Sequence, residues 1–161
     1  MEYINTPLSN IDIQEAVKQF EHKGANIISD KIIEPDTDIE EIFKNRGHCI
    51  VYHAWDNQDI GHWYGIFRDP YGLIFFADSF GENPDHYNKN IIPCLKNNGI
   101  KEIIINKEKW QNNNSSICGR YGILISVLRK NGLNIDDIYN FMEKGKKLYK
   151  SYDKFVLEMT T

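Results

Sequence analysis

Residues 62–77 read HWYGIFRDPYGLIFFA, and this stretch decides the architecture of the chain. Two apolar runs, 62–67 and 73–77, flank the segment 68–72, which contains Asp, Pro and Gly. Aromatic and β-branched residues favour strands, and a short connector of turn-forming residues favours a reversal of the chain. We therefore expect two antiparallel strands joined as a hairpin near the middle of the sequence.

Helices and further strands are predicted on both sides of this hairpin. A first helix begins at Ser9 and stops at Gly24, with an apolar side made of Ile11, Ile13, Ala16, Val17 and Phe20. The other predicted helices span 38–44, 87–97, 118–130 and 135–152. The other predicted strands span 49–54 and 102–106, the second of them buried, and 56–59 is a predicted polar loop. We expect one α+β domain, 1–161, with a small, mostly antiparallel central sheet flanked by helices.

Composition excludes several classes of protein. The 161 residues are 41% hydrophobic and 26% charged, which is ordinary for a globular protein. A formal net charge of −4 gives no general attraction to nucleic acid or anionic lipid. No apolar run approaches the roughly 20 residues that span a bilayer, and the opening MEYIN lacks the features of a signal peptide. We therefore expect no strong nucleic-acid binding, no membrane association and no secretion.

The sequence contains three cysteines: Cys49, Cys94 and Cys118. This number is odd and too small for a disulfide framework, so a reducing cell interior is the expected location and one thiol is free for chemistry. A metal site would be a competing use, built from His48, Cys49, His53 and His62. Structural zinc sites draw on paired spacings such as CxxC, which the sequence lacks. We expect neither a metal nor a cofactor.

Four residues needed for acyl transfer by a thiol occur in a defined order: His62, Asp78, Gln111 and Cys118. A cysteine supplies the nucleophile, an imidazole the base, a carboxylate the group that orients the base, and an amide a donor for the oxyanion. His62 opens one strand of the predicted hairpin and Asp78 follows the other, so the hairpin would bring the two together. His53 and His86 are alternative bases, although His53 lacks such a partner strand.

Cys118 is expected in the first turn of a helix. Free N–H groups and the helix dipole favour an anion at that position, which here is the thiolate. Ser115 or Ser116 is the expected N-cap, and Gly119 would let a substrate backbone approach the sulfur. Gln111 lies on the loop that enters this helix, where its amide and the Cys118 N–H can converge on an oxyanion.

The motifs GHW at 61–63, DSFG at 78–81 and Q…CG at 111–119 resemble, in this order, the adenovirus-type maturation cysteine proteases (adenain-like). That family shares a clan with the SUMO-deconjugating proteases and with the maturation proteases of virophages and other relatives of large DNA viruses. The segment 8–13, LSNIDI, is similar to the amino-terminal helix of the virophage-type members. The resemblance extends to about Leu133.

This resemblance implies an adenain/Ulp-like cysteine protease fold in which Cys118 is the nucleophile and His62 the general base and acid. It implies that Asp78 orients the imidazole and that Gln111 donates to the oxyanion. It also implies that Trp63 lines a narrow channel for the substrate backbone, where family members favour glycine. The substrates would be proteins, in particular viral capsid precursors cleaved during virion maturation, in the virion or the host cell interior.

The chain also departs from the adenovirus enzyme. Its acidic residue is Asp78, where the adenovirus enzyme has glutamate. Aspartate occurs at this place in the SUMO-protease branch. Neither Cys49 nor Cys94 can be assigned to a disulfide with an activating peptide, so the need for such a peptide stays open. The acidic composition predicts that activation by DNA is weak or absent.

Two other functions fit the same residues. A SUMO- or ubiquitin-like deconjugating peptidase of the same clan would cleave the diglycine tails of folded modifiers. A non-catalytic binding module would keep the fold without the reaction, although such a module usually loses at least one of the four residues.

Overall fold

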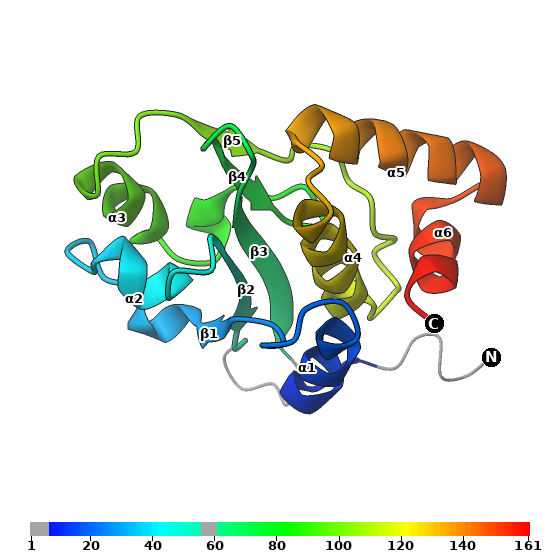
Figure 1. Ribbon diagram of the computed structural model, residues 1–161, viewed down its shortest axis with the longest axis horizontal. Helices are drawn as coiled ribbons and strands as arrows, with labels where there is room; N and C mark the ends of the chain where they lie inside the picture. The colour runs from blue at the N-terminus through cyan, green and yellow to red at the C-terminus, as the bar shows by residue number, and fades with distance from the viewer. Residues whose placement is uncertain (1–6, 56–60) are drawn as a thin grey trace.

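The computed structural model describes residues 7–55 and 61–161, so the predicted polar loop 56–59 lies outside the described residues. The described residues form a five-stranded sheet with the order β1-β2-β3-β4-β5 (Figure 1). Its strands are β1 (Ile27–Ser29), β2 (His48–His53), β3 (His62–Arg68), β4 (Ile74–Ala77) and β5 (Ile103–Ile105). The pairs β2–β3 and β3–β4 are antiparallel, whereas β1–β2 and β4–β5 are parallel.

The predicted hairpin is confirmed as β3 and β4. In its register Gly65 pairs with Ala77, so the residue after β4 lies close to the start of β3. The Asp69 carboxylate accepts hydrogen bonds from the backbone N–H groups of Tyr71 and Leu73, at 2.9 and 3.0 Å. A short acidic side chain that bonds its own turn in this way stabilises the chain reversal that the sequence predicts.

The sheet is antiparallel across its three central strands, which agrees with the predicted mostly antiparallel sheet, and it is mixed because its edge pairs are parallel. Its outer strands, β1 and β5, have three residues each and run parallel to their neighbours. Three residues are too few for a periodic pattern, so β1 leaves no recognisable signal in the sequence. Strand β5 is half-buried rather than buried, because it lies at the edge of the sheet.

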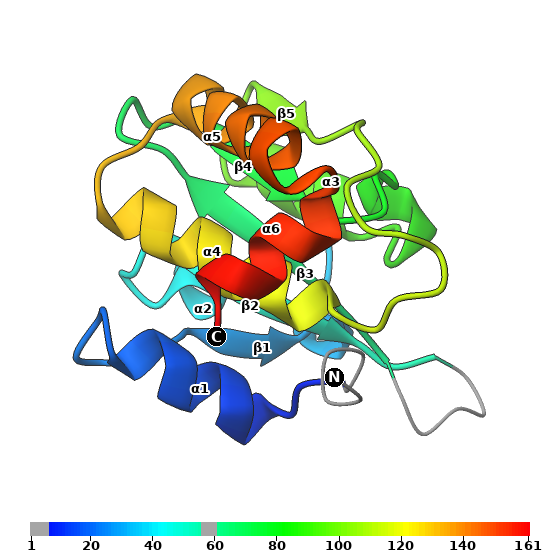
Figure 2. The same cartoon turned by 90° about the vertical axis from the view of Figure 1, so that its right-hand side faces the viewer.

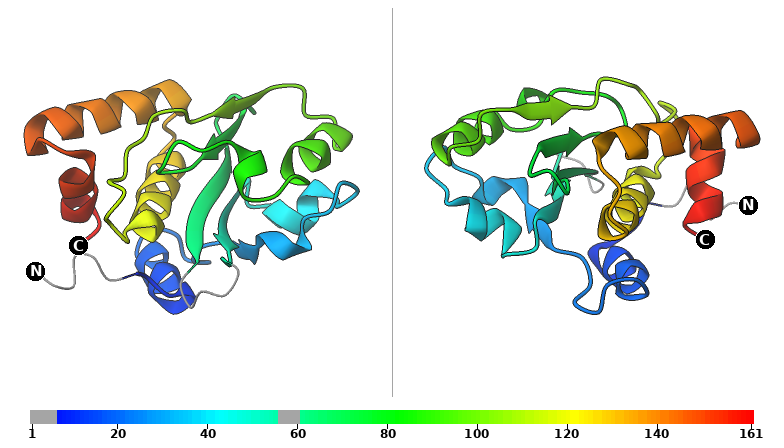
Figure 3. Two further views of the ribbon diagram at one scale, coloured as in Figure 1. Left: turned by 180° about the vertical axis from the view of Figure 1, so that it is seen from behind. Right: turned by 45° about the horizontal axis from the view of Figure 1, so that its top comes forward.

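Helices cover both faces of the sheet (Figures 1 and 3). They are α1 (Asn10–Lys18), α2 (Ile39–Phe43), α3 (Ile91–Asn97), α4 (Cys118–Lys130), α5 (Ile135–Tyr149) and α6 (Tyr152–Met159), with the 3₁₀ turns η2 (Asp30–Ile32) and η3 (Pro84–His86). Helices α1, α4, α5 and α6 lie on one side, as Figure 2 shows, and α2 and α3 lie on the other. Within the described part of the chain, every helix is too short or too polar to cross a membrane.

Both faces of β3 and β4 are buried, which explains their nearly continuous apolar sequences. Phe67 and Phe75 point into the core beneath α4, α5 and α6. Ile66, Ile74 and Phe76 point the opposite way, into the core beneath α2 and α3. Successive side chains of a strand alternate between the faces of a sheet, so a strand covered on both sides needs apolar residues at every position.

Helix α1 begins where the sequence predicts, with Ser9 as the N-cap of a capping box. Ile13 and Val17 are buried, but Ile11 and Phe20, which were expected on the same apolar side, are 69% and 54% exposed. Residues two apart lie on different sides of a helix, so Ile11 cannot share the buried side of Ile13. Phe20 follows the end of the helix.

The helix predicted over 87–97 is shorter in the structure, because α3 begins at Ile91. Asn88 and Asn90 precede it, and their side-chain amides donate to backbone carbonyls of the segment 30–33 at 2.8 and 3.1 Å. These bonds tie the entry of α3 to η2 and the residue after it. Asparagine side chains that bind backbone groups compete with helix formation, which accounts for the shorter helix.

The helix predicted over 135–152 is two helices, α5 and α6. Lys150 adopts a left-handed conformation with φ +67° and ends α5, and the side chain of Ser151 caps α6. The helices pack closely because Gly145 of α5 leaves the space that the ring of Phe155 occupies. The break was not predictable from composition, because a lysine rather than a glycine takes the left-handed position.

Candidate active site

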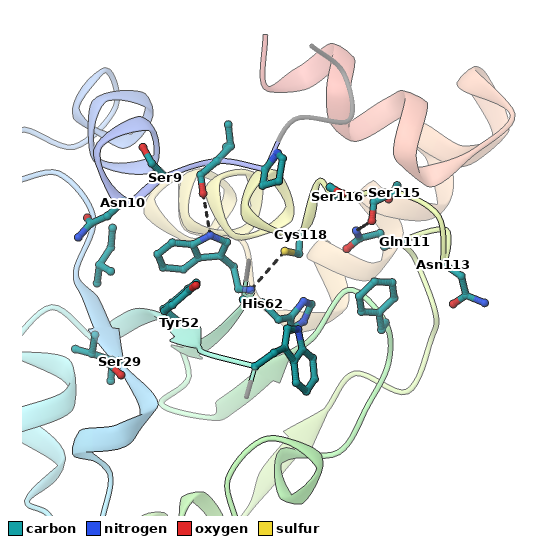
Figure 4. A pocket seen from close by; sticks show the side chains of 18 residues that line it. Ser9, Asn10, Ser29, Tyr52, His62, Gln111, Asn113, Ser115, Ser116 and Cys118 are labelled. Carbon is teal, nitrogen blue, oxygen red and sulfur yellow. Dashed lines mark hydrogen bonds between the residues drawn. The ribbon is translucent and has the colours of Figure 1, made fainter. Parts of the chain in front are cut away.

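A cleft of about 780 Å³ opens where β2 ends, β3 begins and α4 starts (Figure 4). Residues distant in the sequence line it: 7–10, 27–29, Tyr52, Trp55, 61–63, Phe80, Gln111, Asn113, Ser115, Ser116 and Cys118. Three of the four predicted residues, His62, Gln111 and Cys118, are part of this lining. The fourth, Asp78, lies directly behind His62.

His62 and Asp78 form a buried pair. His62 is the first residue of β3 and Asp78 follows the last residue of β4, so the antiparallel hairpin brings them together. The distance from His62 Nε2 to Asp78 Oδ1 is 2.5 Å, and the two residues are 2% and 0% exposed. Because Nε2 bonds the carboxylate, Nδ1 is the ring nitrogen that remains for a second partner.

The surroundings of His62 favour its charged form. Burial lowers the pKa of His62, but the hydrogen bond with Asp78 and the neighbouring Cys118 outweigh burial and raise the pKa to about 9. The imidazolium is therefore the favoured form at neutral pH. A cysteine nucleophile is most reactive when a cationic histidine stabilises its thiolate.

Cys118 is the first residue of α4 and is partly exposed, whereas Cys49 and Cys94 are buried. Its Sγ accepts a hydrogen bond from the backbone N–H of Trp63 at 3.4 Å, drawn as a dashed line in Figure 4. The sulfur therefore lies at the positive end of a helix and also faces a donor from β3. This confirms that α4 begins at the cysteine, as the sequence predicts.

The predicted serine N-cap of α4 is wrong. The N-cap residue is Ile117, which is 1% exposed and packs in the core under α4. The carbonyl of Ser115 instead accepts a hydrogen bond from the Gln111 side chain, which turns this segment toward the cleft. Burial of an apolar residue, rather than a hydroxyl cap, therefore fixes the start of the helix.

The carboxamide of Gln111 is held at both ends. Its Oε1 accepts from Ser79 Oγ at 2.6 Å, and its Nε2 donates to the Ser115 carbonyl at 2.8 Å. A backbone carbonyl only accepts, so the Ser115 contact determines which end of the amide carries the N–H groups. One N–H is used in this bond, and the second has no hydrogen-bond partner among the described residues.

Two residues to which the sequence analysis assigned no role, Ser79 and Tyr87, bond the predicted site residues. The Ser79 carbonyl accepts from the backbone N–H of Gln111 at 2.8 Å, in addition to its side-chain bond. Tyr87 Oη donates to Asp78 Oδ2 at 2.7 Å. The place of Ser79 directly after Asp78 was a usable signal. Tyr87 gave no signal, because only the folded chain brings it back to the carboxylate.

Trp63 and Tyr52 form an aromatic wall of the cleft, with ring centroids 4.8 Å apart. The indole Nε1 of Trp63 donates to the carbonyl of Leu8 at 3.1 Å, so the chain before α1 helps to hold the ring. A Cβ atom at Gly119 would lie 3.3 Å from Cδ1 of Trp63, so close packing accounts for the glycine. Contact of Gly119 with a substrate stays a prediction.

The alternative bases have other partners. His53 Nδ1 lies 2.5 Å from Asp30 Oδ2, and His86 is an exposed residue with Nδ1 3.8 Å from Glu82. Neither histidine belongs to the lining of the cleft in the described part of the chain. Among residues 7–55 and 61–161, no group of three or more His, Cys, Asp or Glu side chains is arranged to hold a metal ion.

No family model matches the chain, and no curated protein matches it. Among solved structures it is similar to a crystal structure of the selenomethionine form of the ASFV pS273R protease, at 15% identity and a TM-score of 0.49. The similarity covers 86% of this chain and 68% of that one. A likeness at this level carries no inference about activity, which must come from the geometry of the cleft.

Proposed function

We propose that the protein is a cysteine endopeptidase, a single domain over 1–161, that cleaves proteins after small residues of the glycine type. The observation that carries the proposal is one cleft in which a partly exposed thiol, Cys118, lies beside a histidine, His62, bonded to a buried carboxylate. The adenain-like branch, viral capsid precursors as substrates and action in the virion or host cell interior depend on the resemblance described above.

The first half of the reaction forms a thioester. The Cys118 thiolate attacks the carbonyl carbon of the scissile bond, and the carbonyl oxygen becomes an oxyanion. The free N–H of the Gln111 amide and the backbone N–H of Cys118 stabilise that charge. The imidazolium of His62 gives its proton to the departing amine, so the C–N bond breaks and the acyl group stays on sulfur.

The second half hydrolyses the thioester. His62, now neutral, accepts a proton from water, and the hydroxide equivalent attacks the acyl carbon through a second oxyanion. The C–S bond breaks, the carboxylic product leaves, and the thiolate and imidazolium are restored. Asp78 keeps the ring in one tautomer throughout, because its carboxylate accepts only from the protonated Nε2.

The cleft suits an extended peptide of low charge. The described residues that line it include no Lys, Arg, Asp or Glu, although 26% of the chain is charged. Trp63, whose backbone N–H donates to Cys118 Sγ, lines the cleft together with Tyr52, and the resemblance described above implies a narrow channel at Trp63. We expect cleavage after glycine to exceed cleavage after larger residues.

The test is reaction of the purified protein with a glycine-ending peptide that carries a thiol-directed electrophile, read by intact mass. We expect one label on the wild type and none on Cys118→Ala. Cys49 and Cys94 are 0% exposed, and burial raises the pKa of both thiols, so neither should compete. His62→Ala should slow labelling strongly, whereas His53→Gln, a matched histidine outside the cleft, should label normally.

Two results would contradict the proposal. Labelling that persists in Cys118→Ala would show that another thiol reacts. Labelling of Cys118 at the same rate in wild type and His62→Ala would show that the imidazole does not activate the sulfur, and the chain would then be better described as a binding module.

A further inference from the structure

We propose that Tyr87 is a positioning residue for the reaction, acting on Asp78 through its hydroxyl and on His62 through its ring. The inference rests on the proposed peptidase function and extends it. Tyr87 contacts both of these residues, is 8% exposed and lies outside the lining of the cleft. It therefore touches neither a substrate nor the reacting sulfur in the described part of the chain.

The hydroxyl of Tyr87 fixes the oxygen of Asp78 that His62 does not use. Asp78 Oδ1 bonds His62 Nε2, while Oδ2 accepts from Tyr87 Oη at 2.7 Å and from the backbone N–H of Glu82 at 3.0 Å. A carboxylate rotates about its Cβ–Cγ bond unless both oxygens are held. With Oδ2 held by two donors, Oδ1 is kept in line with the imidazole.

The rings of Tyr87 and Phe80 both stack on the imidazole of His62. The centroids of His62 and Tyr87 are 5.0 Å apart with an interplanar angle of 18°, and those of His62 and Phe80 are 5.2 Å apart at 26°. Two aromatic rings are thus in stacking contact with the imidazole. These contacts restrict rotation of the ring away from Cys118.

The hydroxyl stays a donor over the working pH range. Burial and the nearby Asp78 carboxylate raise the pKa of Tyr87, so it does not ionise near neutrality. The titratable groups that face this arrangement are Asp78, Glu82, His53, His86, His62, Cys118 and Tyr64. Any change of pH profile must therefore be compared with a control that leaves the carboxylates, the histidines and the thiol in place.

Tyr64 provides that control. It is 2% exposed, its ring stacks on Tyr87 with centroids 4.9 Å apart, and its hydroxyl donates to the buried carboxylate of Asp30 at 3.2 Å. Tyr64→Phe and Tyr87→Phe therefore each remove one buried hydroxyl that donates a hydrogen bond to a buried aspartate. Only the second variant removes a donor from the aspartate that orients His62.

The experiment measures kcat and KM on a glycine-containing peptide for wild type, Tyr87→Phe and Tyr64→Phe. We expect Tyr87→Phe to lower kcat about tenfold, the effect of one hydrogen bond to a charged group, and to leave KM unchanged. Tyr64→Phe should keep the wild-type kcat. Equal kcat values for the two variants would overturn the inference.

A second readout does not depend on turnover. Histidine ring signals followed by NMR over a pH series report protonation of His62 in each variant. We expect His62 to release its proton at lower pH in Tyr87→Phe than in wild type, because a carboxylate that can rotate holds the imidazolium less firmly. If His62 released its proton at the same pH or at a higher pH in Tyr87→Phe than in wild type, the inference would be overturned.

The two readouts separate failure of this inference from failure of the proposed function. If the wild type neither cleaves peptides nor labels at Cys118, the peptidase proposal fails, while the NMR titration still tests the action of Tyr87 on His62. If the wild type is active and Tyr87→Phe behaves like Tyr64→Phe in both measurements, the inference about Tyr87 fails and the peptidase proposal stands.

Discussion

Two histidine–aspartate pairs lie next to each other on paired strands. His53 on β2 and His62 on β3 are direct partners in the strand register. Each has a ring nitrogen 2.5 Å from an aspartate oxygen, in Asp30 and Asp78 respectively. In the distance between imidazole and carboxylate, the two pairs are equal.

They differ in what surrounds them. His62 has the Cys118 thiol beside it, whereas the ring of His53 meets Trp55 and Tyr87 edge-on at 4.7 and 5.4 Å. The carboxylates differ as well. Asp78 divides its donors between two oxygens, while Asp30 Oδ2 accepts from both His53 and Tyr64. The histidine–aspartate distance alone therefore does not distinguish the two pairs, whereas the neighbouring thiol does.

The largest expected effect separates the two histidines. His62→Ala should lower kcat/KM for a glycine-containing peptide by roughly 10⁴-fold or more, because the reaction loses its base and acid. His53→Gln keeps a donor for Asp30 and should stay within about threefold of wild type. Steady-state kinetics on the folded variants checks this. A comparable loss in both would mean that the second pair also takes part in the reaction.

The next effect separates the two carboxylates. Asp78→Asn should lower kcat on the order of 10³-fold, because the amide cannot hold His62 in the required tautomer and charge state. Asp30→Asn should leave kcat near the wild-type value, even if the protein becomes less stable. Rates normalised to the folded fraction, from circular dichroism of each sample, decide between these outcomes.

A smaller effect should appear in stability at alkaline pH. The folded-state pKa of His62, about 9, lies above the ordinary value of 6.5, so the folded protein holds this proton more tightly than the unfolded chain. The resulting stabilisation is complete below pH 6.5 and is lost as the pH rises through 9. The stabilisation from this proton amounts to about 3 kcal/mol at most.

Urea denaturation at pH 6, 7.5 and 9.5 measures this contribution. The unfolding free energy of the wild type should fall over this range, and Asp78→Asn should show a flatter dependence. His48 provides an opposite case on the acidic side, because burial lowers its pKa to about 4. That residue should destabilise the fold as the pH falls from 6.5 toward 4. If the unfolding free energies of the wild type and Asp78→Asn fell equally between pH 7.5 and 9.5, the assignment of the effect to His62 would be contradicted.

The smallest expected effect concerns the serines beside the two aspartates. Ser79 follows Asp78 and bonds Gln111, whereas Ser29 precedes Asp30 and caps η2. Ser79→Ala should lower kcat about tenfold by releasing the amide that serves the oxyanion. Ser29→Ala, although Ser29 lines the cleft, should change kcat little. Inhibition by a peptide aldehyde, which forms an oxyanion-like adduct, should weaken only in Ser79→Ala.

The hairpin and the helix that begins at Cys118 could be predicted because their signals are local. Two nearly continuous apolar runs, a turn with Pro and Gly, and a helical stripe each lie within one segment of sequence. This local pattern also explains why the meeting of His62 with Asp78 follows from a correct hairpin. The partly exposed position of Cys118 could not be derived in the same way, since it depends on how α4 meets β3.

Other features could not be predicted because they depend on distant contacts. Strand β1 has three residues and forms only by pairing with β2. Asn88 and Asn90 shorten α3 through bonds to the segment 30–33. Likewise Ile117 replaces the expected serine cap because the core provides a place for its side chain. Tertiary contacts of this kind override local preference.

Asp78 and Ser79 are consecutive residues, and this fact links proton transfer to oxyanion binding in the proposed reaction. There Asp78, bonded to His62, would orient the group that moves protons, and Ser79, bonded to Gln111, would hold the amide that meets the oxyanion. Their Cα atoms are about 3.8 Å apart across a trans peptide in every conformation of the chain. Proton transfer and oxyanion binding thus share one rigid spacer, so a movement of this turn shifts both together.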